Sequence, residues 1–209
     1  MNLTVTVLQI VAPVFLLASI GFVWVKVGLE YRIQFVTQLA MTLSLPCLIF
    51  VSLMQTRIAP EALTALSLAS VMAYAVISLA FVALIKLLGL EGRTYTAPLI
   101  FGNTGNLGLP LALFAFGDAG LSYAIIVFAI MALWSYTYGI WLVAGAGSLG
   151  RVLREPLVWA TMLGALFMWQ GWQTPQFLTN TLDLLGQMAI PMMLITLGVA
   201  VARLSAQGM

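Results

Sequence analysis

The sequence contains no histidine and only one cysteine, Cys47, among its 209 residues. Without histidine the chain cannot form a His-containing zinc site or a Ser–His catalytic pair. A single cysteine excludes a disulfide within the chain. The sequence also lacks a phosphate-binding loop that ends in Gly-Lys-Ser or Gly-Lys-Thr. We therefore expect no enzymatic activity, no metal site and no bound cofactor.

Charge is equally scarce. Eight basic and six acidic residues make up 7% of the chain, whereas soluble domains are about 25% charged. Apolar residues make up 63%, and the mean hydropathy is +1.11. The basic residues form no dense cluster of the kind that binds nucleic acid. Apolar runs of about 18 residues or more recur, each long enough to cross a ~30 Å hydrocarbon core as a helix. These features predict an all-α, polytopic membrane protein embedded in the lipid bilayer.

We predict seven transmembrane helices, of which the fourth is broken. They cover approximately residues 5–27, 35–54, 63–88, 96–116, 121–143, 156–172 and 177–201. On this division, residues 1–147 hold five spans, and residues 148–209 hold a cytoplasmic loop and two further spans.

Basic residues fall almost entirely on one side of the membrane if the loops alternate sides. That side receives Lys26, Arg32, Lys86, Arg93, Arg151, Arg154 and Arg203, and the other side receives only Arg57. Short loops rich in Lys and Arg stay in the cytoplasm. We therefore expect the N-terminus outside and the C-terminus in the cytoplasm, in the cell membrane (the inner membrane of a bacterium).

Spaced landmarks indicate an internal repeat. Pro13, Gly21 and Gly28 match Pro156, Gly164 and Gly171 at an offset of 143, and Leu45-Pro46 matches Ile190-Pro191 at an offset of 145. In this order the matches predict that the sixth span begins a second copy of the first five. Because five is odd, the copies would be inverted in the membrane, as in many secondary transporters. The alternative is chance similarity between apolar helices that contain proline.

Helix-breaking and polar residues interrupt the fourth predicted span at mid-membrane depth. Glycine costs about 1 kcal/mol and proline about 3 kcal/mol inside a helix, so we expect unwound backbone near residues 105–108 and a second half-helix opening near Pro110. Its N-terminus would present unpaired N–H groups and a partial positive charge to a small organic anion. The alternative is a kinked helix whose asparagines only join neighbouring helices. The candidate binding residues are Asn103, Thr104, Gly105, Asn106, Gly108 and Pro110.

Other intramembrane residues are weaker candidates. Pro46 and Pro191, at matched positions, predict helix kinks in the scaffold. Asp183 and Gln187 lie one turn apart in the seventh span. Carboxylates within membranes are often functional, so these two residues form a possible secondary site, unless Asp183 simply faces water at the outer end of its span.

Several motifs resemble the auxin efflux carrier family, which belongs to a superfamily that includes bile acid/sodium symporters. They are Leu45-Pro46-Cys47-Leu48-Ile49-Phe50, Gly102-Asn103-Thr104-Gly105-Asn106-Leu107-Gly108-Leu109-Pro110, Glu155-Pro156-Leu157 and Leu184-Leu185-Gly186-Gln187-Met188-Ala189-Ile190-Pro191. The resemblance covers about the first seven of ten helices. It implies two inverted five-helix repeats, with the fourth and ninth helices broken near the substrate. It also implies a scaffold of spans one, two, six and seven, which makes a homodimer contact, and a moving group of spans three to five.

The expected function is a permease that moves a small organic anion, auxin-like or another carboxylic acid, by alternating access. The family includes bacterial permeases for such acids. Coupling to H⁺ or Na⁺ is an open alternative to uncoupled transport. The competing hypothesis is a non-transporting seven-helix membrane protein, a receptor or an assembly factor, in which the Gly-Asn segment only packs.

Overall fold

The computed structural model of the chain describes residues 3–56, 58–139, 150 and 154–207, and every regular element in these ranges is helical. The prediction of an all-α, polytopic membrane protein is confirmed. Arg57, Arg151 and the end of the fifth predicted span, residues 140–143, lie outside the described residues.

The helices follow the predicted spans in order. They are α1 (Leu3–Lys26), α2 (Ile33–Leu39), the π-helical turn η1 (Ala40–Ser44), α3 (Leu45–Met54), α4 (Pro60–Leu87), α5 (Gly92–Ile100), the π-helical turn η2 (Thr104–Gly108), α6 (Leu109–Trp134), the π-helical turn η3 (Ser135–Gly139), α9 (Pro156–Gln170), α10 (Gln176–Gln187) and α11 (Ala189–Gln207).

Five described segments are long and apolar enough to cross a membrane. They are Thr4–Lys26, Ile33–Met54, Pro60–Leu87, Gly92–Gly139 and Gln176–Leu204. The sixth predicted span corresponds to α9, which has only 15 residues. Pro156 starts this helix, and Gly171 ends it at φ 67°, a left-handed conformation that glycine adopts at little cost.

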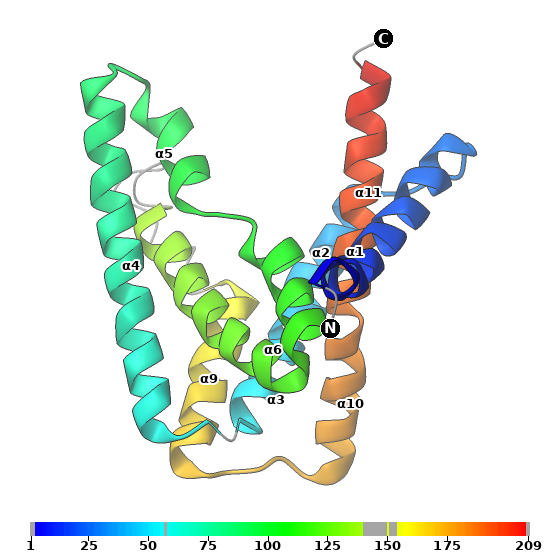
Figure 1. The fold of residues 1–209 in the computed structure, drawn as a ribbon. Helices are drawn as coiled ribbons and strands as arrows, with labels where there is room; N and C mark the ends of the chain where they lie inside the picture. Colours follow the sequence, from blue (N-terminus) through cyan, green and yellow to red (C-terminus); the bar gives the residue numbers. More distant parts are fainter. Residues whose placement is uncertain (1–2, 57, 140–149, 151–153, 208–209) are drawn as a thin grey trace.

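The segment Gly92–Gly139 contains two predicted spans rather than one. Its 48 residues would extend about 72 Å as a straight helix, more than twice the hydrocarbon thickness. The chain turns back at Gly117, whose backbone (φ 65°, ψ −158°) is not helical. Only glycine adopts these angles readily. As a result α6 forms a V of two arms, residues 109–116 and 118–134 (Figure 1).

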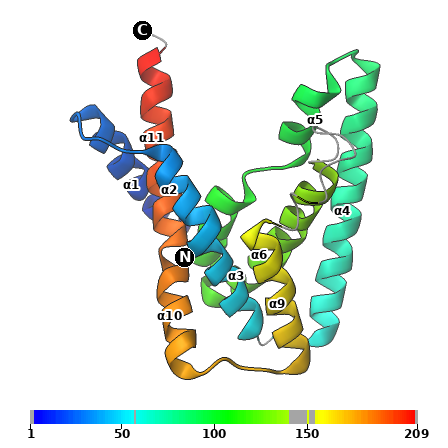
Figure 2. The same cartoon turned by 180° about the vertical axis from the view of Figure 1, so that it is seen from behind.

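The connections between helices alternate between the two ends of the molecule. The α1–α2 loop, the α4–α5 loop and the C-terminal end of α11 lie at one end, and the α3–α4 connection, the bend of α6 and the α9–α10 loop lie toward the other (Figures 1 and 2). The assignment of these two ends to opposite sides of a membrane, with the first in the cytoplasm, stays a prediction. Lys26, Lys86, Arg93 and Arg203 belong to α1, α4, α5 and α11, and Arg32 immediately precedes α2.

Two helix pairs form a tightly packed unit, and glycines allow their close approach. In the α1–α11 pair, a Cβ atom at Gly21 would overlap the Ile195 carbonyl, and one at Gly198 would overlap the Ala18 carbonyl. In the α3–α9 pair, a Cβ atom at Gly164 would lie 3.3 Å from the Phe50 Cα atom. Small residues at such crossings are typical of membrane helices.

The contacts of these pairs follow the sequence offsets. Gly21 matches Gly164 at offset 143, and Phe50 matches Ile195 at offset 145. In the α1–α11 pair, Gly21 lies against Ile195. In the α3–α9 pair, the matched residues Gly164 and Phe50 lie against each other. The structure thus places matched residues in matched contacts.

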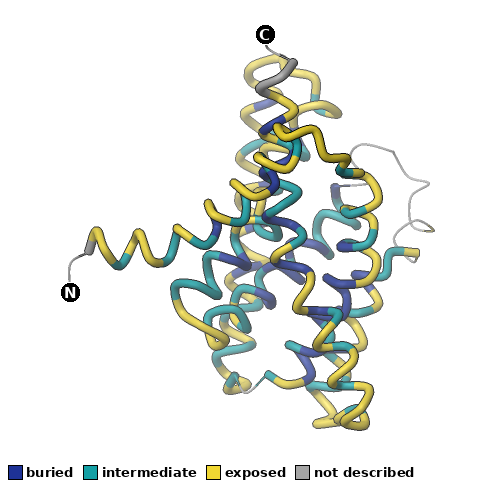
Figure 3. Tube along the Cα trace, turned by 90° about the vertical axis from the view of Figure 1, so that its right-hand side faces the viewer, coloured by how far each residue is buried: buried dark blue, intermediate teal, exposed yellow. Residues whose placement is uncertain are grey.

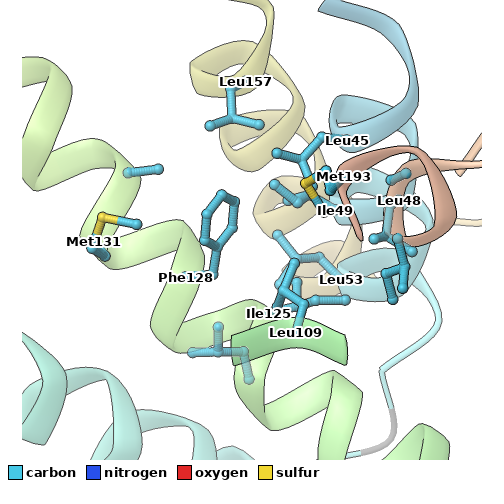
Figure 4. Packing of buried hydrophobic residues seen from close by; sticks show 14 of the residues in the cluster. Leu45, Leu48, Ile49, Leu53, Leu109, Ile125, Phe128, Met131, Leu157 and Met193 are labelled. Atoms are coloured by element: carbon cyan, nitrogen blue, oxygen red, sulfur yellow. The ribbon is translucent and has the colours of Figure 1, made fainter. Parts of the chain in front are cut away.

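The core lies where α3, α6, α9 and α11 meet (Figure 4). Its most deeply buried side chains include Leu45, Ile49, Leu109, Ile125 and Leu194. Leu109 belongs to the first arm of α6, and Ile125 to the second. Because lipid is as apolar as leucine, van der Waals packing rather than the hydrophobic effect stabilises such a core in a bilayer. This packing holds both arms of α6 against α3.

Large apolar side chains cover the outer faces, and buried residues concentrate in the middle of the molecule (Figure 3). On α4, Leu68, Val76 and Leu79 are 62%, 63% and 73% exposed. Water would disfavour such a surface, but a lipid bilayer accommodates it.

Candidate functional site

The fourth span is interrupted at a stretch that begins four residues before the predicted one. Helix α5 ends at Ile100, residues 101–103 are not helical, and helix resumes at Thr104 and continues through η2 into α6. The expectation of unwound backbone at residues 105–108, with a half-helix opening near Pro110, was therefore wrong in position. The extended stretch between α5 and η2 is visible in Figure 1.

A π-helical turn explains why Pro110 does not end the helix. Inside an α-helix, a proline ring clashes with the carbonyl four residues earlier. Here the five-residue turn Thr104–Gly108 precedes Leu109-Pro110, and the Leu109 N–H donates to the Thr104 carbonyl, five residues back. The wider turn relieves the clash. The same arrangement precedes Leu45-Pro46, where the Leu45 N–H donates to the Ala40 carbonyl.

The new helix opens with unpaired donors. The Asn103 carbonyl accepts hydrogen bonds from the Leu107 and Gly108 N–H groups at 3.2 and 3.3 Å, and these are the first bonds of the helix. The N–H groups of residues 104–106 therefore have no intrahelical acceptor. Together with the helix dipole they create a partial positive charge at the break.

The predicted site residues lie around this opening. Asn103 is exposed and makes no side-chain cap hydrogen bond, and Asn106 is half-buried. The Thr104 Oγ1 atom is buried without a hydrogen-bond partner. A Cβ atom at Gly105 would lie 3.0 Å from Phe128, so glycine permits close packing there. Pro110 is fully buried in the core.

A cavity of about 550 Å³ adjoins the break. Gly102 and Thr104 line it from the break itself. Tyr74, only 8% exposed, lines it from α4, and the remaining lining is mostly apolar. Sequence analysis missed Tyr74, because only the packing of α4 against α5 brings it to the break.

Asp183 and Gln187 lie in a different place, a cleft of about 690 Å³ between α3, α6, α10 and α11. The Gln187 Nε2 atom donates to Asp183 Oδ2 at 2.9 Å. Pro191 also lines this cleft, as does Asp118, which follows Gly117 and was not predicted. A Gly-Asp pair inside an apolar run is a turn signal that could have identified it.

The two matched prolines occur where the regular α-helix is interrupted. Pro46 is buried and follows η1, and Pro191 lies just after Met188, the non-helical residue between α10 and α11. Their assignment as scaffold kinks remains a prediction.

The chain matches the family described as membrane transport protein over residues 6–152 and 145–208. It belongs to this family. The match confirms the resemblance to auxin efflux carriers that the motifs indicated. No curated protein matches the chain.

As a membrane transport protein, the chain is expected to bind its cargo without chemical change, and its family consists of transporters rather than enzymes. Within the described ranges, no three His, Cys, Asp or Glu side chains come together as a metal site would require. Neither the cavity nor the cleft is lined by Lys or Arg. An anion at the break would therefore depend on backbone N–H groups and amides.

Proposed function

We propose that this membrane transport protein is a secondary transporter of a small organic anion, which binds at the break in the fourth span. The observation that carries the proposal is the unwound segment at residues 101–103, followed by a helix N-terminus with unpaired N–H groups. Irregular backbone at membrane depth is tolerated where protein or a water-filled cavity surrounds it. A carboxylate at the same position would accept the free hydrogen bonds.

Asparagine amides complete the proposed site. Asn103 is at the N-cap position of η2, and Asn106 is one turn further along. Each amide supplies both donors and an acceptor. In a low-dielectric environment these groups, with the helix dipole, would hold one negative charge without a cation from the protein.

Alternating access would require two groups of helices to move against each other. The scaffold in this proposal comprises α1, α2–α3, α9 and α10–α11, and the moving group comprises α4, α5 and α6. The matched contacts of Gly21 and Gly164 support an inverted repeat within the scaffold. The cleft that contains Asp183 and Asp118 lies between the two groups and would be a route for cargo.

The orientation belongs to the same proposal. With the basic helix ends in the cytoplasm, the N-terminus is outside, and the bend of α6 lies toward the outer side. Homodimer formation through the scaffold is a further part of the proposal and follows from the family resemblance. Coupling to H⁺ or Na⁺ is an alternative to uncoupled transport within the same proposal.

Uptake by proteoliposomes that contain the 209-residue chain tests the proposal, with radiolabelled small carboxylates as probes. Asn103→Ala and Asn106→Ala should each reduce apparent affinity by about tenfold to a hundredfold, because the carboxylate loses a hydrogen bond worth about 1.5–3 kcal/mol. Asn180→Ala is the matched control, since Asn180 is exposed on α10, and it should behave like the wild type.

Two results would redirect the proposal. Normal uptake by both asparagine variants would move the site toward Asp183 and Gln187. Absence of carboxylate uptake by correctly folded wild-type protein would favour a non-transporting role as a receptor or assembly factor.

A further inference from the structure

Basic side chains gather where the α1–α2 loop meets α11, at the periphery of the molecule (Figures 1 and 2). Arg32 and Arg203 line a surface hollow of about 400 Å³ there, and Lys26 ends α1 just before the loop. The Arg203 guanidinium donates to the Tyr31 carbonyl. Among the described residues no carboxylate pairs with Arg203, so most of its five N–H donors are available to a ligand.

The loop that carries this hollow is held in place by its own contacts. The Tyr31 hydroxyl lies 2.8 Å from Thr196 Oγ1 on α11. The Trp24 indole N–H, on α1, donates to the Glu30 carbonyl in the loop at 3.3 Å. Together with the Arg203 bond, these contacts join α1, the loop and α11. The two arginines of the hollow are therefore carried by an ordered backbone.

An apolar groove of about 420 Å³ lies on α1 beside the hollow. Leu29, the last residue of its lining, directly precedes Glu30 of the hollow, and Trp24 in the groove bonds to the Glu30 carbonyl, so the two depressions adjoin. From Leu16 to Val27 the groove extends along α1 for about 16 Å at 1.5 Å per residue. This length is similar to the ~15 Å hydrocarbon layer of one leaflet.

This combination matches the chemistry of an anionic phospholipid. Arginine binds phosphate through paired hydrogen bonds, and basic pockets at the ends of membrane helices bind lipid headgroups. Trp24 and Tyr31 are of the residue types that lie at headgroup depth. We propose that the hollow binds the phosphate of an anionic phospholipid and that the groove on α1 holds one of its acyl chains. This lipid is not the cargo, so the inference does not depend on the proposed function.

Glu30 limits the affinity of this site. Its carboxylate lines the hollow and accepts a hydrogen bond from Arg32 Nε at 2.7 Å. The Arg32 and Glu30 side chains are 77% and 74% exposed, and an ion pair this exposed contributes little, so a phosphate can share Arg32. Two arginines and one glutamate leave one net positive charge in the hollow, and Lys26 adds another nearby. An anionic lipid is therefore favoured over a zwitterionic one.

Native mass spectrometry of the 209-residue chain in detergent tests the proposal, because it resolves each bound lipid and each oligomer. The probes are phosphatidylglycerol and phosphatidylcholine with the same palmitoyl and oleoyl chains. Wild-type protein should bind the first phosphatidylglycerol about tenfold more tightly than phosphatidylcholine. Arg203→Gln and Arg32→Gln should each reduce phosphatidylglycerol affinity about fivefold, since one basic residue near a headgroup contributes about 1 kcal/mol. Glu30→Gln should increase it.

Matched variants separate this site from a general effect of charge. Arg93→Gln removes the same charge from an exposed position on α5, away from the groove, and should leave both affinities unchanged. Ser19→Phe places a ring in the lining of the groove. It should weaken binding of the long-chain phosphatidylglycerol and leave dihexanoyl phosphatidylglycerol unaffected, because chains that short do not fill the groove. Excess sn-glycerol 3-phosphate should not displace the lipid.

The contrary results have distinct meanings, and each overturns the proposal. Equal affinity of the wild type for the two lipids, or the same loss in Arg93→Gln as in Arg203→Gln, would indicate only general attraction. Displacement by sn-glycerol 3-phosphate would indicate a site for free phosphate. A lipid-free dimer that Ser19→Phe disrupts would show that a second copy covers the groove. If Arg203→Gln fails to fold, Arg32→Gln and Glu30→Gln, with opposite expected effects, still decide the matter.

Discussion

A single added methyl group at the crossing of α1 and α11 should destabilise the protein. A Cβ atom at Gly198 would lie 2.6 Å from the Ala18 carbonyl carbon and 2.9 Å from the Ala18 Cα atom, and it would overlap the carbonyl oxygen. Real Cβ atoms essentially never approach other atoms within 3.0 Å. The obstruction is backbone, so no side-chain rotation can relieve it, and Gly198→Ala would force the two helices apart.

The magnitude follows from the cost of overpacking. Extra methyl groups in a packed core cost about 1–3 kcal/mol, and the rigid backbone at this crossing places the effect near 3 kcal/mol. For a chain of this size about 1 kcal/mol lowers Tm by about 2–4 °C. We therefore expect Gly198→Ala to lower Tm by about 6–12 °C. Gly21→Ala forces the same two helices apart from the other side. The decrease in Tm of the double variant should therefore be smaller than the sum of the decreases of the two single variants.

Cys47 provides the assay. It is the only cysteine of the chain and is 8% exposed, so a thiol-reactive fluorogenic dye will label the protein mainly as it unfolds on heating. Gly92→Ala is the matched control, because a Cβ atom there would meet only Thr96 Oγ1 at 3.7 Å, an ordinary contact. Gly198→Ala with the same Tm as Gly92→Ala, within about 2 °C, would refute the close crossing of α1 and α11.

Two further predictions concern topology and the break. A reporter active only in the cytoplasm should give signal when fused after residue 209 and none when fused after residue 117, and the reverse pattern would contradict the orientation. In a Cys47→Ala background, Asn103→Cys should react with a small water-soluble thiol reagent, because residue 103 is exposed at the break. Leu109→Cys is the control and should not react, because Leu109 is only 1% exposed. Complete protection of residue 103 would indicate a closed helix that is only kinked.

Much of the fold could be predicted from hydropathy, because each span is a long apolar run with Gly, Pro or charged residues at its ends. The pairing of Asp183 with Gln187 could also be predicted from the sequence, because side chains four residues apart are neighbours on a helix surface. The shortness of α9 was less apparent, because apolar residues continue up to Gly171, where the left-handed backbone ends the helix.

The position of the break was harder to predict, for a physical reason. The second half-helix was expected to open near Pro110, but a π-helical turn of five residues accommodates this proline inside the helix, and the unwinding occurs at Gly102 and its neighbours. Propensity describes a regular α-helix and does not anticipate this alternative geometry. The place of Tyr74 could not be predicted from the sequence for another reason. It lies thirty residues before Thr104 and lines the cavity only because of tertiary packing.

The turn at Gly117 has a consequence for how the protein is made. Residues 92–139 leave the ribosome as one apolar segment, and a straight helix of that length cannot be accommodated by a translocon and bilayer about 30 Å thick. The segment therefore fits the bilayer only as two arms joined at Gly117, with Asp118 at the turn. A charged residue costs about 2.5–3.5 kcal/mol at the centre of an inserting helix, and the many Leu, Ile, Phe and Val residues of the two arms offset this cost. Replacing Gly117 with a residue that favours a continuous helix would join residues 104–134 into one helix of about 46 Å, longer than the hydrocarbon core, so we expect the defect to appear at membrane insertion.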